Sequence, residues 1–475
     1  MVKPSLYYKL GFFITKKCAI NIEMKIKKIL EKRKNIDLTT LDIPHALFYL
    51  GLPIVFINLL NIAYNLADTF WLGRLSEKAL AAITFSFPLI FLFISLGLGF
   101  SIAGSILVAQ NTGAGNKREV SYAGGQAFIF SIIISLILGI VSITMIEPIL
   151  RFLGASPEVM PLGVSYMKWI IYFLPFLFGF AVFVSLMRGH GDTFTPMLVM
   201  TFSVILNIIL DPILIFGWWI FPALGIEGAA IATIFCRGIG FLMGLFILFS
   251  NFAGFKIYLK DLIPNFSYFK KLLRVGIPAS IETTSRAIFA NAMLLVVGNF
   301  STEVVAGYGI GIKVFSMVFL PALAVSRSVE TITGQNIGAC NFKKAKEVSY
   351  LAAKFMFLLM TGLGVVSYIL AHQIISVFTN SQEVINTGAE FLKYISLTFG
   401  FIAGARIFGG GFRGAKQTTL AAMIAFITMG IIRFPVSYFL SPIIGPKGIW
   451  IAFATSNIVG LGVALFWFKN KFLYN

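Results

Sequence analysis

Long apolar runs alternate with short polar connections along almost the whole chain. Each run has roughly 20 or more residues, the length that an α-helix needs to cross the hydrocarbon core of a bilayer. A β-barrel would show short segments of alternating polarity instead. The pattern predicts an all-α polytopic membrane protein with twelve transmembrane helices, at about residues 46–72, 83–109, 126–150, 163–187, 196–219, 225–250, 275–299, 304–330, 348–375, 388–411, 418–440 and 447–468.

The second half of the chain repeats the first at an offset of 225 residues. A further match, between residues 225–232 and 445–452, has an offset of 220 and indicates a shorter connection before the last span. Six spans per half is an even number, so both halves enter the membrane from the same side, and a pseudo-twofold axis along the membrane normal is expected. The segments matched at 225 are LGLP (50–53) with VGIP (275–278), QNTGAGNKREV (110–120) with QNIGACNFKKA (335–345), and MRGHGDT (187–193) with FRGAKQT (412–418).

The repeat divides the chain into two six-helix lobes joined by a basic connection that contains Pro264. Such a connection is typical of an amphipathic cytoplasmic linker. Two lobes of this kind suit a secondary transporter that alternates access by rocking one lobe against the other. The predicted organisation is a basic cytoplasmic N-terminal extension (1–45), an N-lobe (46–250), a cytoplasmic linker (251–274), a C-lobe (275–468) and a cytoplasmic tail (469–475).

Composition and charge agree with this topology. Hydrophobic residues make up 58% of the chain and charged residues 12%, too little polar surface for a soluble protein of this size. The net charge of +19 comes from ten basic residues in the first 45 positions and others in the connections on one side. The positive-inside rule then places both termini in the cytoplasm, which explains the charge better than nucleic-acid binding. The basic stretch at 24–35 is expected either to lie on an anionic leaflet or to form a solvated tail, and Met24 is a second candidate first residue.

Motifs of catalysis are missing from the sequence. The three cysteines lie far apart, and the three histidines show no metal-ligand spacing. No G-x-x-x-x-G-K-[ST] loop occurs, so the chain has no visible means of hydrolysing a nucleotide. The sequence therefore predicts a protein that is not an enzyme and binds no cofactor beyond a coupling ion.

A carboxylate lies inside the first predicted span, where a charge is costly. Asp68 lies about one turn before the outer end of that span, and a charge at the bilayer centre costs about 2.5 to 3.5 kcal/mol on insertion scales. At helical spacing it shares a face with Asn61, Tyr64 and Asn65. This polar stripe must face protein or water, and it serves either a functional site or hydrogen bonding between helices.

A second carboxylate, Asp211, lies in the fifth span. Asn207 is four residues earlier and therefore on the same face. Pro212 cannot donate a backbone hydrogen bond and loosens the preceding turn. A carboxylate beside freed carbonyl groups suits a small cation or a proton relay, and the alternative is an isolated acid beside a helix kink.

The repeat supplies an internal comparison for both acids. Asp68 corresponds to Met293, and the segment that matches Asp211, residues 426–439, contains Arg433 and no acid. A carboxylate needed only to assemble a six-helix lobe would occur in both halves, so the N-lobe is predicted to carry a specialised acidic site. Two carboxylates close together in a dry pocket resist being ionised together, which lets the pair load a proton or bind Na+.

Other charged residues in the predicted spans are expected to form ion pairs within the protein or to anchor helix ends. Glu282 and Arg286 are four residues apart on the seventh span. The others are Arg237, Lys313, Arg327, Glu330, Arg406 and Arg433.

These motifs together resemble the multidrug and toxic compound extrusion (MATE) family. The resemblance covers about residues 40–470 and rests on D-T-x-x-x-G (68–73), Q-N-x-G (110–113), R-G-x-G-D-T (188–193) and N-x-x-x-D-P (207–212). It implies export of amphipathic, often cationic compounds in exchange for H+ or Na+, by a protein expected to be a monomer among the lipids of the plasma membrane.

The resemblance also implies which residues hold the coupling ion. The ion site of the family's N-lobe is matched by Asp68, Asn207, Asp211 and Thr233, which would also be the ligands of a bound Na+. Tyr64 and Tyr166 match members of the surrounding hydrogen-bond network. The place of an acid essential in another branch holds Arg286, and residues 394–412 contain no acid, so the chain resembles the DinF branch.

Two other classes of function stay open at this stage. The first is a lipid-linked oligosaccharide flippase of the same superfamily, although such flippases commonly have fourteen spans or a strongly basic central cavity. The second is a channel or a purely structural membrane protein, for which no re-entrant filter is visible. The sequence decides neither the substrate nor the choice between H+ and Na+.

Overall fold

The computed structural model describes residues 37–154, 156–218, 221–250, 252 and 254–472. The predicted basic stretch at 24–35 lies outside the described residues. The described chain is helical between short turns. The first half contains α2 (Ile43–Leu75), α3 (Glu77–Gly113), α4 (Lys117–Phe152), α5 (Met160–Tyr172), α6 (Leu174–His190), α7 (Phe194–Phe216) and α8 (Gly225–Phe249).

The second half has the same order of helices with more interruptions. It contains η1 (Leu259–Leu262), α9 (Phe266–Val297), α10 (Thr302–Val318), α11 (Leu320–Gly338), α12 (Phe342–Ile369), α13 (Ala371–Ser376), α14 (Gln382–Ser396), α15 (Phe399–Gly414), α16 (Thr418–Phe426), η2 (Ile427–Arg433), α17 (Phe434–Ile444) and α18 (Lys447–Lys471).

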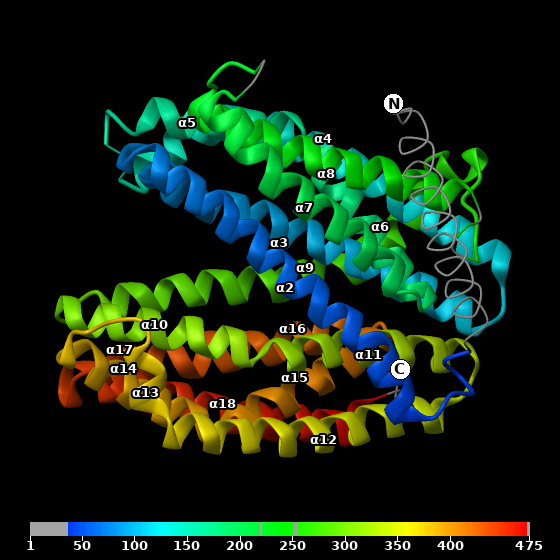
Figure 1. Ribbon diagram of the computed structural model, residues 1–475. Coiled ribbons are helices and arrows are strands. Elements are labelled where there is room, and N and C mark those ends of the chain that lie inside the picture. The colour runs from blue at the N-terminus through cyan, green and yellow to red at the C-terminus, as the bar shows by residue number, and fades with distance from the viewer. Residues whose placement is uncertain (1–36, 155, 219–220, 251, 253, 473–475) are drawn as a thin grey trace, which may run out of the picture.

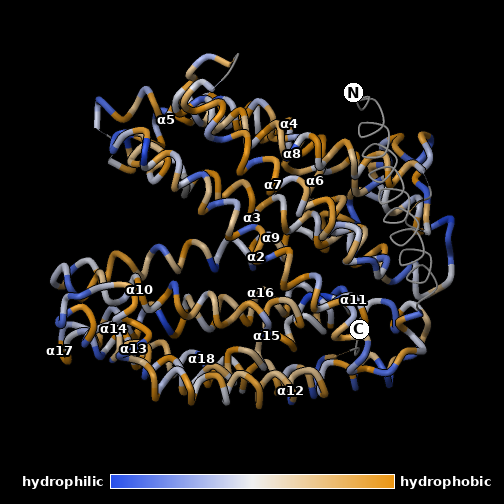
Figure 2. The backbone as a smooth tube through the Cα atoms, in the orientation of Figure 1, coloured by the Kyte–Doolittle hydropathy of each residue, from blue (hydrophilic) through white to orange (hydrophobic). Residues whose placement is uncertain are grey.

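Twelve helical spans follow from these bounds. In the described part of the chain, eight helical segments are long and apolar enough to cross a membrane, and three bent helix pairs bring the number to eleven. The twelfth is α9, which has 32 residues and carries Glu282 and Arg286 within its apolar stretch. Polar residues gather toward the ends of the helices and apolar residues along their middles (Figure 2). The predicted twelve-helix, all-α membrane fold is therefore confirmed.

One predicted span in each repeat is bent, and the two bends lie at equivalent positions. α5 and α6 meet at 53° around Phe173, and α14 and α15 meet at 53° around Thr398, which is the position related to Phe173 by the repeat offset. Pro175 follows the first break, and no proline lies at the second. The shared bend is thus a property of the repeat and not of a single proline.

The helices form two bundles that meet at one end and diverge toward the other (Figure 1). Helices α2 to α8 form the N-lobe and α9 to α18 the C-lobe. The bundles lie together at the end where the described chain begins and ends, and they separate toward the end that holds α5 and α10 (Figure 1). With the predicted topology, the closed end is cytoplasmic and the diverging end faces outward.

The first helix of each lobe begins inside the core of the other lobe. The start of α2 packs into the hydrophobic core of the C-lobe, and the start of α9 packs into that of the N-lobe. The residues that do so are related by the repeat offset, so the exchange follows the pseudo-twofold symmetry. They are Ile43, Leu47 and Leu50 of α2, and Tyr268, Leu272 and Val275 of α9.

The segment between the lobes is fastened to α4 by Gln126. This fully buried amide donates to the carbonyl oxygens of Asp261 and Ile263, each at 2.7 Å, and accepts from the backbone N–H of Asn265 at 2.9 Å. Asn265 then caps α9 by accepting from the N–H of Tyr268. One side chain thus sets where the connection ends and the second lobe begins.

Replacing Gln126 with Ala is expected to lower stability by about 1 to 3 kcal/mol, because buried backbone groups lose their partners. The measurement is the midpoint of thermal unfolding of the purified protein in a mild detergent. Gln382→Ala is the matched control, because Gln382 is exposed on α14 and bonds only within its own helix. An equal, small shift for both variants would show that Gln126 does not hold the connection.

Candidate functional site

Three N-lobe helices bring the predicted polar residues together. Asp68 comes from α2, Asn207 and Asp211 from α7, and Thr233 from α8. Asn207 and Asp211 are fully buried, and Asp68 and Thr233 are each 9% exposed. The Thr233 hydroxyl donates to Asp68 Oδ2 at 3.3 Å, and the Asn207 amide donates to Asp211 Oδ1 at 2.8 Å. Four residues from three separate segments therefore form one buried site.

The two carboxylates of this site face each other. Asp68 lies close to Asp211 and Asn207. One oxygen of each carboxylate, Asp68 Oδ1 and Asp211 Oδ2, accepts no hydrogen bond from any described residue, and the same holds for Asn207 Oδ1. Three acceptor atoms without donors point to a positively charged species, because a buried carboxylate needs a proton or a cation.

Two tyrosines border this site. The Tyr64 hydroxyl donates to the backbone carbonyl of Thr233 at 3.1 Å, which ties α2 to α8 one turn before Asp68. Tyr166, from α5, is buried and close enough to act electrostatically on both carboxylates. Asn65, which the helical spacing placed on the same stripe, is exposed and donates to the backbone carbonyl of Asn61. The structure therefore places Tyr64 and Asp68 at the buried site and Asn65 outside it.

Sequence reasoning missed the part that Arg237 plays beside the site. Its guanidinium lies 4.4 Å from the centre of the Tyr64 ring, and Nη2 donates to Asn61 Oδ1 at 3.2 Å. Arg237 follows Thr233 by four residues on α8, so the same spacing that linked Asn207 to Asp211 was available as a signal. The cation faces the edge of an acidic site and steadies the tyrosine that holds α2.

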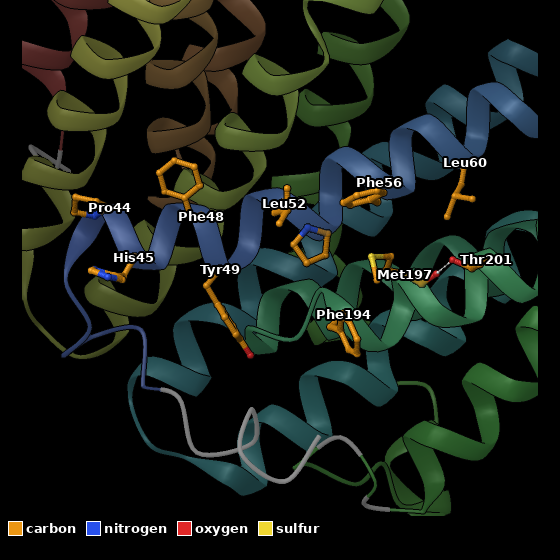
Figure 3. A pocket seen from close by; sticks show the side chains of 11 residues that line it. Pro44, His45, Phe48, Tyr49, Leu52, Phe56, Leu60, Phe194, Met197 and Thr201 are labelled. Atoms are coloured by element: carbon orange, nitrogen blue, oxygen red, sulfur yellow. Dashed lines mark hydrogen bonds between the residues drawn. The ribbon is translucent and has the colours of Figure 1, made fainter. Parts of the chain in front are cut away.

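A lateral groove lies along the N-terminal parts of α2 and α7, away from the parts that hold Asp68 and Asp211. It has a volume of about 880 Å³ and is almost entirely apolar (Figure 3). No acid lines it. The groove therefore suits lipid chains or the apolar part of an amphiphile, and it is separate from the acidic site. Its lining residues are Pro44, His45, Phe48, Tyr49, Leu52, Pro53, Phe56, Leu60, Phe194, Met197 and Thr201.

The lobes are joined at their closed end by a symmetric pair of hydrogen bonds. The amide of Gln110 on α3 donates to the carbonyl oxygen of Gly414 at 2.9 Å, and that of Gln335 on α11 donates to Gly189 at 3.0 Å. The two bonds are equivalent, because Gln110 and Gln335, and Gly189 and Gly414, are each related by the repeat offset of 225 residues. We call this pair of bonds the glutamine latch. It closes one end of the lobe interface and follows the same pseudo-twofold as the fold.

Two glycines let the helices approach closely enough for this latch. A Cβ atom on Gly113 would overlap the backbone carbonyl of Gln335, and one on Gly338 would overlap that of Gln110. These two glycines are also related by the repeat offset. The closed interface requires glycine at these positions because a side chain would not fit, and not because the backbone is unusually flexible there.

Most of the other embedded charges do form ion pairs, as predicted. Glu282 pairs with Arg286 at 3.3 Å and with Arg413 at 3.0 Å, and Glu330 pairs with Arg327 at 3.1 Å. Arg433 is an exception, because its hydrogen bonds in the described part of the chain go to the neutral side chains of Ser456 and Asn457.

Comparison with known proteins gives one consistent result. The profile of the MatE family matches residues 53–213 and 278–439, more than half of the chain. The chain is 29% identical to the probable multidrug resistance protein NorM of Thermotoga maritima, over 90% of this chain and 93% of that protein. It is 27% identical to the probable multidrug resistance protein YoeA of Bacillus subtilis, over 88% and 93%.

A further relative is named for a different activity, and solved structures share the fold. The FAD transporter of Shewanella oneidensis is 26% identical over 91% of this chain and 96% of that protein. A crystal structure of a MATE protein in its bent conformation superposes with a TM-score of 0.85, at 23% identity over 91% of this chain and 96% of that one. An outward-facing multidrug resistance MATE transporter gives 0.83, at 24% identity over the same shares.

Proposed function

Since the chain belongs to the MatE family of membrane transporters and is not an enzyme, we propose that it is a secondary active efflux pump. In this proposal it exports amphipathic organic compounds, often cationic ones, in exchange for H+ or Na+. The acidic site of the N-lobe holds the coupling ion, and the two lobes rock to expose a central space to either side in turn. The observation that carries the proposal is the facing pair Asp68 and Asp211, buried without a donor between them.

The residues present fit either coupling ion. Na+ prefers several oxygen ligands, and the site offers two carboxylates, the Asn207 carbonyl oxygen and the Thr233 hydroxyl. A proton would need only one carboxylate oxygen, and two acids held together out of water share a proton readily. In both cases the ion neutralises a charge that the buried site otherwise leaves uncompensated, which makes the site sensitive to an ion gradient.

The glutamine latch supports the rocking motion. Its two bonds and two close glycine contacts are symmetric and join the lobes at the closed end, so opening that end requires these contacts to break. The bundles already diverge at the opposite end (Figure 1). With the predicted cytoplasmic termini, the conformation described is the outward-facing one, and the inward-facing one requires the latch to open.

The relatives are named for more than one class of substrate, since they include multidrug resistance proteins and an FAD transporter. Small organic solutes with apolar surface suit the family and the apolar lateral groove. We place the protein in the plasma membrane as a monomer with both termini in the cytoplasm, in line with the distribution of its Lys and Arg residues.

The proposal is tested by reconstituting the purified protein in proteoliposomes and imposing the pH gradient and the Na+ gradient separately. Uptake of a fluorescent amphiphilic dye into the vesicle lumen should follow one of the two gradients and stop when that gradient is collapsed. Dye movement that is indifferent to both gradients, or ion flux far above transporter turnover, would refute coupled export.

Thr233→Val tests the ligand set of the ion site. The substitution keeps the shape of the side chain but removes the hydroxyl that bonds Asp68. Loss of about 1 kcal/mol corresponds to about a fivefold rise in the ion concentration that gives half-maximal transport. The control is Thr455→Val on α18, whose exposed hydroxyl bonds only backbone carbonyls of its own helix. Identical ion dependence in both variants would show that Thr233 is not a ligand of the coupling ion.

A further inference from the structure

Seven charged side chains meet where the C-lobe touches the N-lobe, outside the acidic site. We call them the arginine cluster. Arg413 lies at its centre and bonds Glu282 through Nη1 at 3.0 and 3.1 Å, Glu330 through Nε at 2.8 Å, and Ser326 through Nη2 at 3.0 Å. The cluster consists of Glu282, Arg286, Arg327, Glu330, Arg406 and Arg413 of the C-lobe, with Arg188 of the N-lobe.

The cluster has more positive than negative charge. Five guanidinium groups share two carboxylates, and only Arg413 donates to both acids. Arg327 and Arg286 each donate to one acid, at 3.1 and 3.3 Å, and the other two make longer contacts: 3.6 Å from Arg406 to Glu282 and 3.7 Å from Arg188 to Glu330. Burying unpaired charge is costly, so a cluster with a surplus of cations favours an additional anion.

Three of these arginines can be reached from outside the protein core. The side chains of Arg286, Arg327 and Arg406 are 25%, 23% and 20% exposed, whereas those of Arg413, Glu282 and Glu330 are at most 4% exposed. Arg286 Nε and Arg406 Nη1 donate to no described residue. Both of these donor atoms are themselves buried, so the accessible part of the cluster presents surplus positive charge, whereas its buried part is neutralised internally.

The repeat shows that a six-helix lobe does not need this cluster in order to fold. At the positions equivalent to Glu282, Arg286, Arg327, Glu330 and Arg406, the N-lobe has Ile57, Asn61, Ile102, Ser105 and Ala181. Only Arg413 has a charged counterpart, Arg188. The two lobes therefore differ in charge: the N-lobe carries two unmatched acids, whereas the C-lobe carries a cluster with three unmatched arginines against two unmatched acids, and in addition Arg433, which bonds only neutral side chains among the described residues.

We propose that Arg286, Arg327 and Arg406 bind an anionic group, a carboxylate, sulfonate or phosphate, on the transported molecule. Guanidinium groups form bidentate, charge-assisted hydrogen bonds to such groups, and three of them on neighbouring helices can surround one. The inference rests on the proposed transport function and narrows its substrates to amphiphiles that carry an anionic group, including zwitterions whose cationic part faces the acidic lobe.

The test is equilibrium binding of two dyes that differ only in this group: a cationic rhodamine ethyl ester and its free carboxylic acid, which is a zwitterion. Fluorescence anisotropy is measured with the full-length protein in nanodiscs of phosphatidylcholine. We expect the free acid to bind at least about tenfold more tightly than the ester, as a charge-assisted bidentate contact would give. Equal affinities, or tighter binding of the ester, would overturn the proposal without any variant being made.

Variants assign the effect to the cluster. Arg406→Gln should reduce the preference for the free acid to within about twofold, and Arg406→Lys should retain part of it, because charge remains while the fork geometry is lost. The control is Arg74→Gln, since Arg74 is exposed at the end of α2 and contacts Phe70. A preference that survives Arg406→Gln, Arg286→Gln and Arg327→Gln alike would refute the assignment.

Two further comparisons complete the test. The first distinguishes an anion on the transported molecule from one on a lipid, and the second distinguishes failure of the anion site from failure of the proposed pump. Adding phosphatidylglycerol to the nanodiscs should leave the preference intact; loss of the preference would mean that a lipid headgroup occupies the cluster, and would overturn the assignment to a transported solute. Binding is measured without any ion gradient, so a protein that prefers the free acid but shows no gradient-driven transport refutes the pump and not the anion site.

Discussion

Asp68→Asn and Asp211→Asn are each expected to abolish accumulation of substrate against a gradient. Moving one charge through about 100 mV supplies about 2.3 kcal/mol, which sustains about a 50-fold substrate ratio for one-to-one exchange. Asparagine keeps the size of the side chain but neither takes up a proton nor offers a charge to Na+. The steady-state ratio of dye across proteoliposomes should therefore fall from as much as about 50-fold to about one.

Structural damage is separated from loss of coupling by two comparisons. Downhill dye equilibration and thermal unfolding should change little in both variants, because Asn retains the hydrogen bond that Thr233 or Asn207 makes. Glu383→Gln is the matched acid control, exposed at the start of α14. Full accumulation by Asp68→Asn or Asp211→Asn would place the coupling ion elsewhere.

Gly113→Ala and Gly338→Ala are expected to shift the protein away from the conformation described here. In each variant one methyl group overlaps a backbone carbonyl of the other lobe, which cannot move aside as a flexible side chain could. Overpacking of this kind costs about 1 to 3 kcal/mol, which changes the ratio of two conformations by about 5- to 150-fold. Transport should slow because one state of the cycle is disfavoured.

Spin labels at Glu77→Cys and Thr302→Cys, with the native cysteines replaced by serine, measure this shift. Both positions are exposed, begin α3 and α10 at the diverging ends of the lobes, and are related by the repeat offset. The distance distribution should move from long toward short values in the glycine variants. Gly362→Ala, on a part of α12 with no neighbouring atom in reach, should leave it unchanged. No difference between Gly113→Ala and Gly362→Ala would show that the latch does not set the conformation.

Much of the fold and half of the site could be predicted from the sequence, for physical reasons. Spanning helices have to be apolar over about 20 residues, so their number and order were readable. Spacing of four placed Asn207 beside Asp211, and burial made both acids conspicuous. The meeting of α2, α7 and α8 was not readable, because spacing shows which face a residue occupies and not which helix faces it.

What could not be predicted depends on contacts between distant segments. Thr233 and Tyr166 were assigned by resemblance alone, and Arg237 was grouped with structural charges although it lies over Tyr64. The bend at Thr398 has no proline in the sequence to indicate it. The exchange of the α2 and α9 starts between the cores follows from packing that no single repeat contains.

The central claim is that substrate and cation move in opposite directions through one mechanism that requires Asp68 and Asp211. It is tested most directly by reversing the driving force. Proteoliposomes are loaded with dye and given no ion gradient, and movement of H+ or Na+ into the lumen is followed as the dye leaves. The account predicts cation counterflow in the unmodified protein and none when both acids are replaced by asparagine. Counterflow in the double variant, or dye exit without cation entry in the unmodified protein, would contradict it.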